Sequence, residues 1–240
     1  MYYVDSHCHI EDKAFNKVRD SLIKEDLKII TSGVGLGGIK RALECYEKYN
    51  IYLTLGFHPA DVKADDKIID RCYNIIKENR DKILAVGEIG MDIKRENYER
   101  QKEVFLKFMN LAIEINKPIV LHARGFEEEL FKLSETKAMF HCYSGSLELA
   151  KDIGESGNLI SLSTLVCFSS HHKKLAEKLD IDYLTTETDS PYLSPIKGEK
   201  NKPENVKLVV RELAKLKEMD EEEVKDIIYK NTSKFFGRWL

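Results

Sequence analysis

Short apolar runs rich in β-branched residues recur along the chain, and longer segments with helical spacing of their apolar residues separate them. Runs of this length and composition are typical of buried strands in a parallel sheet. Eight such runs are present, and a helical segment follows each of them. They span residues 2–6, 28–34, 51–55, 83–88, 118–121, 138–141, 159–162 and 183–187.

The clearest helix is predicted over residues 96–116. Its apolar residues recur at intervals of three and four positions, which places them on one face of a helix. Two more helical segments follow the last strand, over residues 203–218 and 221–236, and we expect them to complete an outer ring of helices. The apolar stripe of the clearest helix consists of Val104, Phe105, Phe108, Leu111, Ala112 and Ile115.

The regular alternation of strands and helices predicts a parallel sheet with crossover connections. Such a sheet is either open and covered on both faces or closed into a barrel, and eight units favour the barrel. The 240 residues suit one barrel, and no linker, internal repeat or low-complexity tract divides them. We therefore predict an α/β fold, a single-domain TIM (β/α)8 barrel over residues 1–240 with an extra C-terminal helix.

Composition narrows the class of protein only broadly. A hydrophobic content of 42% and a charged content of 33% are typical of a globular protein with a charged surface. The formal net charge of −3 excludes a basic field over the whole chain, so any nucleic-acid contact needs a local patch. No apolar run reaches the length of about 20 residues that spans a bilayer. Five scattered cysteines without a C-x-x-C pair favour a reduced, cytoplasmic setting.

Polar residues gather at the C-terminal ends of the predicted strands, where barrels of this class build their active sites. The first strand ends in Asp5-Ser6-His7-Cys8-His9. A spacing of two in an extended chain points His7 and His9 to the same side. The H-x-H motif is short, however, and a pair of ordinary loop histidines explains it equally well when it stands alone.

Later strands end in further candidate ligands. Glu88 follows an apolar run, and a buried carboxylate is costly unless it is paired or bound to a metal. The fifth strand ends in His122-Ala123-Arg124, the sixth in His141 and the eighth in Glu187-Thr188-Asp189. The candidate metal ligands are His7, His9, Glu88, His122, His141 and Asp189.

Two of the remaining histidines are interpreted as structural residues. His171 and His172 are neighbours at the start of a helical segment and point about 100° apart, so they cannot easily share one ion. We predict that they form a surface pair outside the site.

The glycine-rich residues 33–38 could present backbone N–H groups to a phosphate, but they match neither a P-loop nor a dinucleotide fingerprint. An ordinary turn is the favoured interpretation.

Together these segments resemble the TatD family of metal-dependent deoxyribonucleases, within the wider group of amidohydrolase-like barrels. The resemblance covers nearly the whole chain, in family order. Two positions depart from the family pattern, because Gly125 stands where an acid is common and Lys197-Gly198 replaces the usual Arg-Gly. The matching segments are D-S-H-C-H at Asp5, G-F-H-P at Gly56, G-E-I-G-M-D at Gly87, H-A-R at His122, H-C-Y-S-G at His141 and E-T-D-S-P-Y-L at Glu187.

The resemblance implies two divalent cations, Mg²⁺, Mn²⁺ or Zn²⁺, that share one carboxylate. Imidazole ligands favour transition metals on affinity, while the family resemblance also allows magnesium. The first cation would be held by His7, His9, Glu88 and Asp189, and the second by Glu88, His122 and His141.

The chemistry of two cations predicts roles for the residues around them, and the resemblance adds His58 and Arg124. Asp189 would position and deprotonate the attacking water, and Glu88 would fix the ion pair. Glu187 would orient one of the ligands without binding a cation itself. His58 and Arg124 would face the substrate, while a structural salt bridge is an equally good interpretation of Arg124.

We favour a nuclease that removes nucleotides from the end of single-stranded or frayed DNA by metal-dependent phosphodiester hydrolysis. We expect it to need no obligate protein partner and to bind no membrane. Arg124 and the lysine-rich residues 197–202 favour nucleic acid, although a solvated loop would look the same. The alternative is a small-molecule amidohydrolase acting on a cyclic amide, ester or phosphoester. A non-catalytic protein stabilised by metal is the third reading, and the open, complete ligand set argues against it.

Overall fold

The computed structural model describes residues 1–237, and within them eight strands form one parallel sheet. Each strand pairs with the next strand along the chain, so the order in the sheet is the order in the sequence. The strands are β1 (Tyr3–Cys8), β2 (Leu27–Val34), β3 (Tyr52–Gly56), β4 (Ile83–Asp92), β5 (Ile119–Arg124), β6 (Ala138–Phe140), β7 (Leu159–Leu162) and β8 (Leu184–Thr186).

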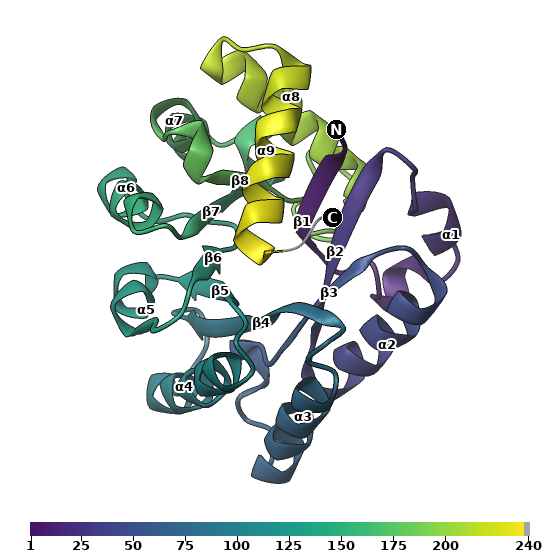
Figure 1. Cartoon of the computed structure of the whole chain (residues 1–240), viewed down its shortest axis with the longest axis vertical. Helices are drawn as coiled ribbons and strands as arrows, with labels where there is room; N and C mark the ends of the chain where they lie inside the picture. The colour runs from purple at the N-terminus through teal and green to yellow at the C-terminus, as the bar shows by residue number, and fades with distance from the viewer. Residues whose placement is uncertain (238–240) are drawn as a thin grey trace.

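The sheet curls into a barrel (Figure 1). Hydrogen bonds join its first and last strands and the residues that follow them. The amide of His9 donates to the carbonyl of Ser190 over 2.8 Å, and the amide of Asp189 donates to the carbonyl of His7 over 3.0 Å. Nearer the start of the strands, the Thr186 hydroxyl donates to a β1 carbonyl over 2.9 Å. The predicted TIM-barrel fold is therefore confirmed.

Helices between successive strands form an outer ring, as the alternating pattern predicted. The helix predicted over residues 96–116 is present as α4, and the one over residues 203–218 is α8, preceded by a short 3-10 turn (Pro203–Asn205). Within residues 1–237, no helix combines the length and apolar character that crossing a bilayer requires. The ring consists of α1 (Arg19–Leu22), α2 (Gly35–Lys48), α3 (Asp66–Glu78), α4 (Tyr98–Glu114), α5 (Glu127–Leu133), α6 (Leu147–Glu155), α7 (Ser170–Lys178) and α8 (Val206–Lys217).

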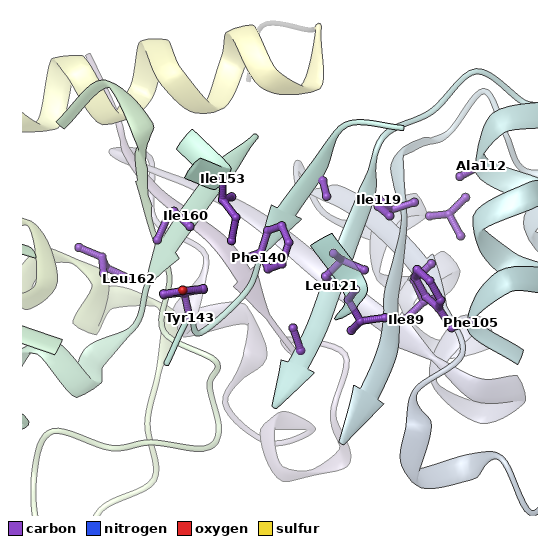
Figure 2. Packing of buried hydrophobic residues seen from close by; sticks show 14 of the residues in the cluster. Ile89, Phe105, Ala112, Ile119, Leu121, Phe140, Tyr143, Ile153, Ile160 and Leu162 are labelled. Carbon is purple, nitrogen blue, oxygen red and sulfur yellow. The ribbon is translucent and has the colours of Figure 1, made fainter. Parts of the chain in front are cut away.

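The main hydrophobic core lies between the strands and the ring of helices. Figure 2 shows Ile89 of β4 and Leu121 of β5 beside Phe105 of α4, and all three side chains are at most 1% exposed. Burying side chains of this size stabilises the fold by about 1.5–3 kcal/mol each. The apolar stripe predicted for the clearest helix therefore faces the barrel, and it holds β4 and β5 in place.

The last helix, α9 (Glu221–Phe236), lies across the N-terminal opening of the barrel (Figure 1). In Figure 2 it passes the starts of the strands, whose arrows point away from it. Its Tyr229 and Phe236 pack in one cluster with Val4 of β1 and Leu84 of β4. The predicted helix is present over residues 221–236, but its expected place in the outer ring is wrong, because its aromatic side chains cover the apolar floor of the barrel.

Two β-bulges decide which residues face the barrel axis near the C-terminal ends of the strands. The pairing of β1 with β2 shifts between Asp5 and Cys8, and the pairing of β4 with β5 shifts between Gly87 and Ile89. A bulge inserts one extra residue and so interrupts the alternation of side chains between the two faces. In β4 the extra residue is Glu88, which points inward while Ile89 packs outward into the core.

Candidate metal centre

The six residues predicted as metal ligands lie together at the C-terminal end of the barrel. They come from β1 and the residue after it, β4, β5, the position after β6 and the turn after β8. Histidine and carboxylate atoms from these elements form groups whose ligand atoms lie within 4.8 Å of one another. The strand ends thus bring together residues that are up to 182 positions apart in the sequence, namely His7, His9, Glu88, His122, His141 and Asp189.

The two carboxylate oxygens of Glu88 face different histidines. Oε2 lies 3.5 Å from Nε2 of His7 and 3.8 Å from Nε2 of His9. Oε1 lies 2.7 Å from Nδ1 of His122 and 3.2 Å from Nε2 of His141. Burial raises the pKa of Glu88, but the surrounding histidines outweigh burial and hold the pKa well below its ordinary value. Glu88 is thus a carboxylate between two groups of imidazoles, the geometry expected of a bridging ligand.

Asp189 faces the same centre from a constrained turn. Its Oδ1 lies 3.6 Å from Nε2 of His9 and 3.9 Å from Nε2 of His7. The backbone of Asp189 has a φ of 55°, an uncommon left-handed conformation for a residue with a side chain. Fully buried Asp5 fixes this turn, because its carboxylate accepts the amide and the hydroxyl of Thr188 at 2.8 and 2.6 Å.

Two of the predicted ligand histidines are oriented by oxygen atoms behind them. Nδ1 of His9 lies 2.8 Å from the carbonyl oxygen of Ser32, and Nδ1 of His141 lies 3.0 Å from Oε1 of buried Glu187. Because these oxygens accept, the ring proton lies on Nδ1 and the lone pair of Nε2 faces the centre, as a metal-binding histidine requires. This is the geometry expected of an orienting residue, the role predicted for Glu187.

The electrostatics of the centre favour positive charge. Burial lowers the pKa of His141, but the nearby carboxylates of Glu187 and Glu88 outweigh burial and raise it well above its ordinary value. His9 follows the same pattern, because the carboxylates of Asp189 and Glu11 together outweigh its burial and raise its pKa well above the ordinary value. A divalent cation supplies the positive charge that these carboxylates attract, in place of the ring protons.

Asp92, at the end of β4, is a site residue that sequence reasoning missed. Its carboxylate is buried, and Oδ2 lies 3.2 Å from Nε2 of His122 and 3.3 Å from Nη1 of Arg124. Burial raises the pKa of Asp92, but the bond from His122 and the Lys94 amide outweigh it and lower the pKa to about 2. Asp92 therefore orients His122 as Glu187 orients His141. Its even spacing from Glu88 along a strand was the signal that could have found it.

The buried ring nitrogens of His7 show whether these residues fit a metal ion. Among residues 1–237, neither of its buried ring nitrogens has a hydrogen-bond partner. Burial lowers the pKa of His7, so the ring is neutral. An unsatisfied buried polar group is costly, yet Nε2 faces the carboxylates of Glu88 and Asp189. A cation between these atoms would give Nε2 of His7 and both carboxylates a partner, so the donor set fits the predicted metal.

His58 belongs to the cluster, but its ring proton lies on the other nitrogen than in His9 and His141. Its Nδ1 accepts the amide of Ala60 over 2.9 Å, so a neutral ring carries its proton on Nε2. That nitrogen lies 3.4 Å from Oε1 of Glu88 and 3.3 Å from Nδ1 of His122. A protonated nitrogen has no lone pair for a metal, although the distances alone would allow it as a ligand. His58 is therefore a hydrogen-bond donor facing the cavity, as its predicted substrate role requires.

A cavity of about 540 Å³ opens above the centre. Arg124 lines it, and its half-exposed side chain also pairs with Asp92. The structural salt bridge is therefore present, and the substrate contact of Arg124 stays a prediction. Arg41 of α2 and Arg95 after β4 line the cavity too, although neither was predicted. The lysine-rich residues 197–202 do not contribute to this lining. The carboxylates that line the cavity are Glu11, Asp12, Asp61, Glu88, Asp92, Glu127 and Asp189.

His171 and His172 lie outside the centre, as predicted, but they are not both on the surface. His172 is buried, with Nε2 3.1 Å from Oγ of Ser144 and Nδ1 2.8 Å from Oγ of Ser169. Burial lowers the pKa of His172 to about 4. His171 donates to the carbonyls of Ser144 and Gly145. The predicted surface pair is therefore wrong for His172, because both histidines fix the connection that follows β6.

Replacing Glu187 with Gln tests the orienting role. The amide oxygen still accepts from His141, but the negative charge that raises the basicity of the ring is lost. We expect the affinity for Mn²⁺ to fall about 10- to 100-fold, measured by calorimetric titration of chelator-stripped protein. Glu199→Gln is the matched control, because Glu199 is an exposed acid in the connection that follows β8. Equal affinities in the two variants would show that Glu187 does not act through His141.

Comparison with known proteins places the chain in a family. The family model described as TatD related DNase matches residues 4–237. The uncharacterized metal-dependent hydrolase MJ1582 of Methanocaldococcus jannaschii is 68% identical over 244 residues, with 99% of this chain and 98% of that protein covered. Human deoxyribonuclease TATDN3 is 26% identical, covering 98% and 94% respectively. The crystal structure of the TatD homologue YJJV from Escherichia coli K12, 26% identical, superposes with a TM-score of 0.90 over 98% of each chain. The chain therefore belongs to the TatD family of metal-dependent hydrolases.

Proposed function

We propose that this hydrolase cleaves the phosphodiester bonds of DNA and removes nucleotides from the end of a single-stranded or frayed strand. The observation that carries the proposal is the convergence of oriented imidazoles on Glu88, beneath a cavity lined by three arginines. The name of the human relative, a deoxyribonuclease, supports DNA as the substrate. A concave barrel mouth also admits a strand end more readily than a continuous duplex.

The donor set fits two divalent cations, Mg²⁺, Mn²⁺ or Zn²⁺, that share Glu88. When bound, such a pair polarises the phosphodiester, lowers the pKa of a water and neutralises charge on the attacking and leaving oxygens. One cation would be held by His7, His9, Glu88 and Asp189, and the other by Glu88, His122 and His141.

The residues around this pair supply proton transfer and phosphate binding. Burial raises the pKa of Asp189, but the neighbouring His9, His141 and His7 together outweigh burial and lower the pKa below its ordinary value. Asp189 is thus an ionised carboxylate, suited to accept the proton of the attacking water. The water oxygen bonds to phosphorus as the bond to the leaving oxygen breaks. His58 donates from Nε2 to that leaving oxygen. Arg124, anchored by Asp92, holds a phosphate oxygen.

The charge of the cavity makes DNA binding depend on the cations. Seven carboxylates line the cavity against three arginines, and the protonated rings of His9 and His141 offset only part of this excess. The cavity without metal is therefore acidic and repels a phosphate backbone. Two divalent cations offset four of the negative charges. Binding of DNA and cleavage of DNA should therefore share one requirement for metal.

The proposal is tested with end-labelled DNA and chelator-stripped protein that is reloaded separately with Mg²⁺, Mn²⁺ or Zn²⁺. We expect a ladder that shortens from one end, faster on a single strand or a frayed duplex than on a blunt duplex, and no cleavage in chelator. DNA that stays intact with every cation would contradict the proposal and direct the search to small cyclic amides and esters. Labelled RNA that is shortened faster than DNA would change the assigned substrate.

A further inference from the structure

The cavity above the candidate metal centre has two chemically different walls. Arg95 and Arg124 lie at the ends of β4 and β5. Leu165, Tyr192 and Leu193 lie in the connections that follow β7 and β8. In a closed barrel of eight strands in sequential order, β4 and β8 are on opposite sides of the axis. The two arginines, on a side that also carries Asp92 and Glu127, therefore face the apolar wall across the candidate metal centre.

Tyr192 presents the aromatic surface of the apolar wall. It is 57% exposed, and its ring centroid lies 6.0 Å from that of His9, one of the predicted ligands. No residue of the described chain hydrogen-bonds to its hydroxyl. A single exposed aromatic residue is unremarkable on an ordinary surface. Tyr192 differs because it lines the reaction cavity and lies beside the predicted ligand His9.

The segment that carries Tyr192 is held in one conformation. Asn201 is fully buried, and its side-chain amide donates to the carbonyl of Leu193 over 3.3 Å. The backbone amide of Asn201 donates to the carbonyl of Pro191 over 3.2 Å, and the amide of Tyr192 donates to the carbonyl of Asp189 over 2.9 Å. Both sequence neighbours of Tyr192 are thus tied to one buried residue. A backbone fixed in this way holds Tyr192 at the edge of the cavity, so only its side-chain torsions lose freedom when a partner stacks on the ring.

We propose that Tyr192 stacks on the nucleobase next to the scissile phosphodiester, while the phosphates lie toward Arg95 and Arg124. The inference rests on the proposed nuclease function and adds what its substrate must present, an unpaired base. Stacking accepts every base, because each has a π-face. A base inside a duplex already has neighbours on both faces. Tyr192 therefore selects single strands and frayed ends, without preference for sequence.

The test compares two single-stranded substrates, an oligo-dT and the same oligo-dT whose terminal residues carry tetrahydrofuran in place of the base. Wild-type protein should cleave the abasic ends about 10-fold more slowly, and Tyr192→Ala should remove that difference by slowing only the normal substrate. Tyr192→Phe keeps the ring and should keep the wild-type ratio. Phe168→Ala is the matched control, because Phe168 is 56% exposed but does not line the cavity.

The outcomes separate this inference from the proposed function. If Tyr192→Ala keeps the wild-type ratio, or slows both substrates equally, Tyr192 does not stack on the base and the inference is overturned. Equal cleavage of the two substrates by the wild-type protein overturns it as well, while leaving the nuclease function intact. If the wild-type protein cleaves neither oligonucleotide with any cation, the nuclease function itself has failed, and the stacking inference is overturned with it.

Discussion

We expect the Asp189→Asn substitution to lower the DNA-cleaving activity of the metal-loaded protein by about 10³-fold or more. An amide cannot accept the proton of the attacking water, and it removes one negative charge that faces His7 and His9. The fold should be unaffected, because Asn adopts the left-handed backbone at a φ of 55° more readily than most residues. The readout is kcat on a single-stranded oligonucleotide, with metal content measured on the same sample.

Asp61→Asn is the matched control for this substitution. Asp61 lines the same cavity, but its carboxylate contacts no histidine in the described chain. The chemical change is identical, so the control separates the loss of a base from the loss of one charge in the cavity. We expect the control to stay within about twofold of wild type. A similar loss in both variants, or a loss of less than tenfold for Asp189→Asn, would remove Asp189 from the proposed base role.

The second large effect is expected on stability, from Gly90→Ala. Gly90 has a φ of 144°, a conformation that residues with a side chain rarely adopt, and it pairs with His122 across β4 and β5. A Cβ at this position would lie 2.0 Å from the carbonyl oxygen of His122. A backbone oxygen in the middle of a sheet cannot move away without breaking the pairing. We expect a loss of at least about 4 kcal/mol in the free energy of unfolding, measured with urea.

Gly198→Ala isolates the backbone contribution to that loss. Gly198 also has a positive φ, 85°, but a Cβ there meets nothing within 4 Å. The substitution should cost about 1–2 kcal/mol, from conformational strain alone. If Gly90→Ala is no more harmful than Gly198→Ala, the close contact with His122 is not what requires glycine at position 90.

The periodicity of the sequence was enough to predict the barrel, because strand and helix periods record which faces are buried. It could not place α9, since an amphipathic helix covers an outer face or a barrel end equally well. The two bulges were also hidden, because a single inserted residue leaves no mark on the apolar pattern. The interpretation of the glycine-rich residues 33–38 as an ordinary turn is wrong, because β2 runs to Val34 and α2 begins at Gly35. A Cβ on Gly33 would lie 2.5 Å from the Cβ of Ala42, so glycine lets α2 pack closely on β2.

The candidate ligands were predictable because histidine and carboxylate residues stand out in the sequence when they directly follow apolar strands. The residues that support them were not, because their roles depend on partners far away in the sequence. Asp5 was visible only as part of a motif, yet it fixes Thr188, which lies 183 positions later. Asn201 falls in a stretch that was singled out for its lysines, and its contribution is a buried amide that ties the preceding turn together.

The position of α9 also constrains how the protein is made. Val4 leaves the ribosome 225 residues before its partner Tyr229 and 232 residues before its partner Phe236. At about 5–20 residues per second, the apolar floor of the barrel waits on the order of ten seconds or more for its cover. During that time the growing chain exposes an apolar surface, formed by the starts of its strands, that can associate with other chains. Cotranslational folding can therefore build the helical ring progressively, but a sealed barrel appears only once synthesis has passed Phe236.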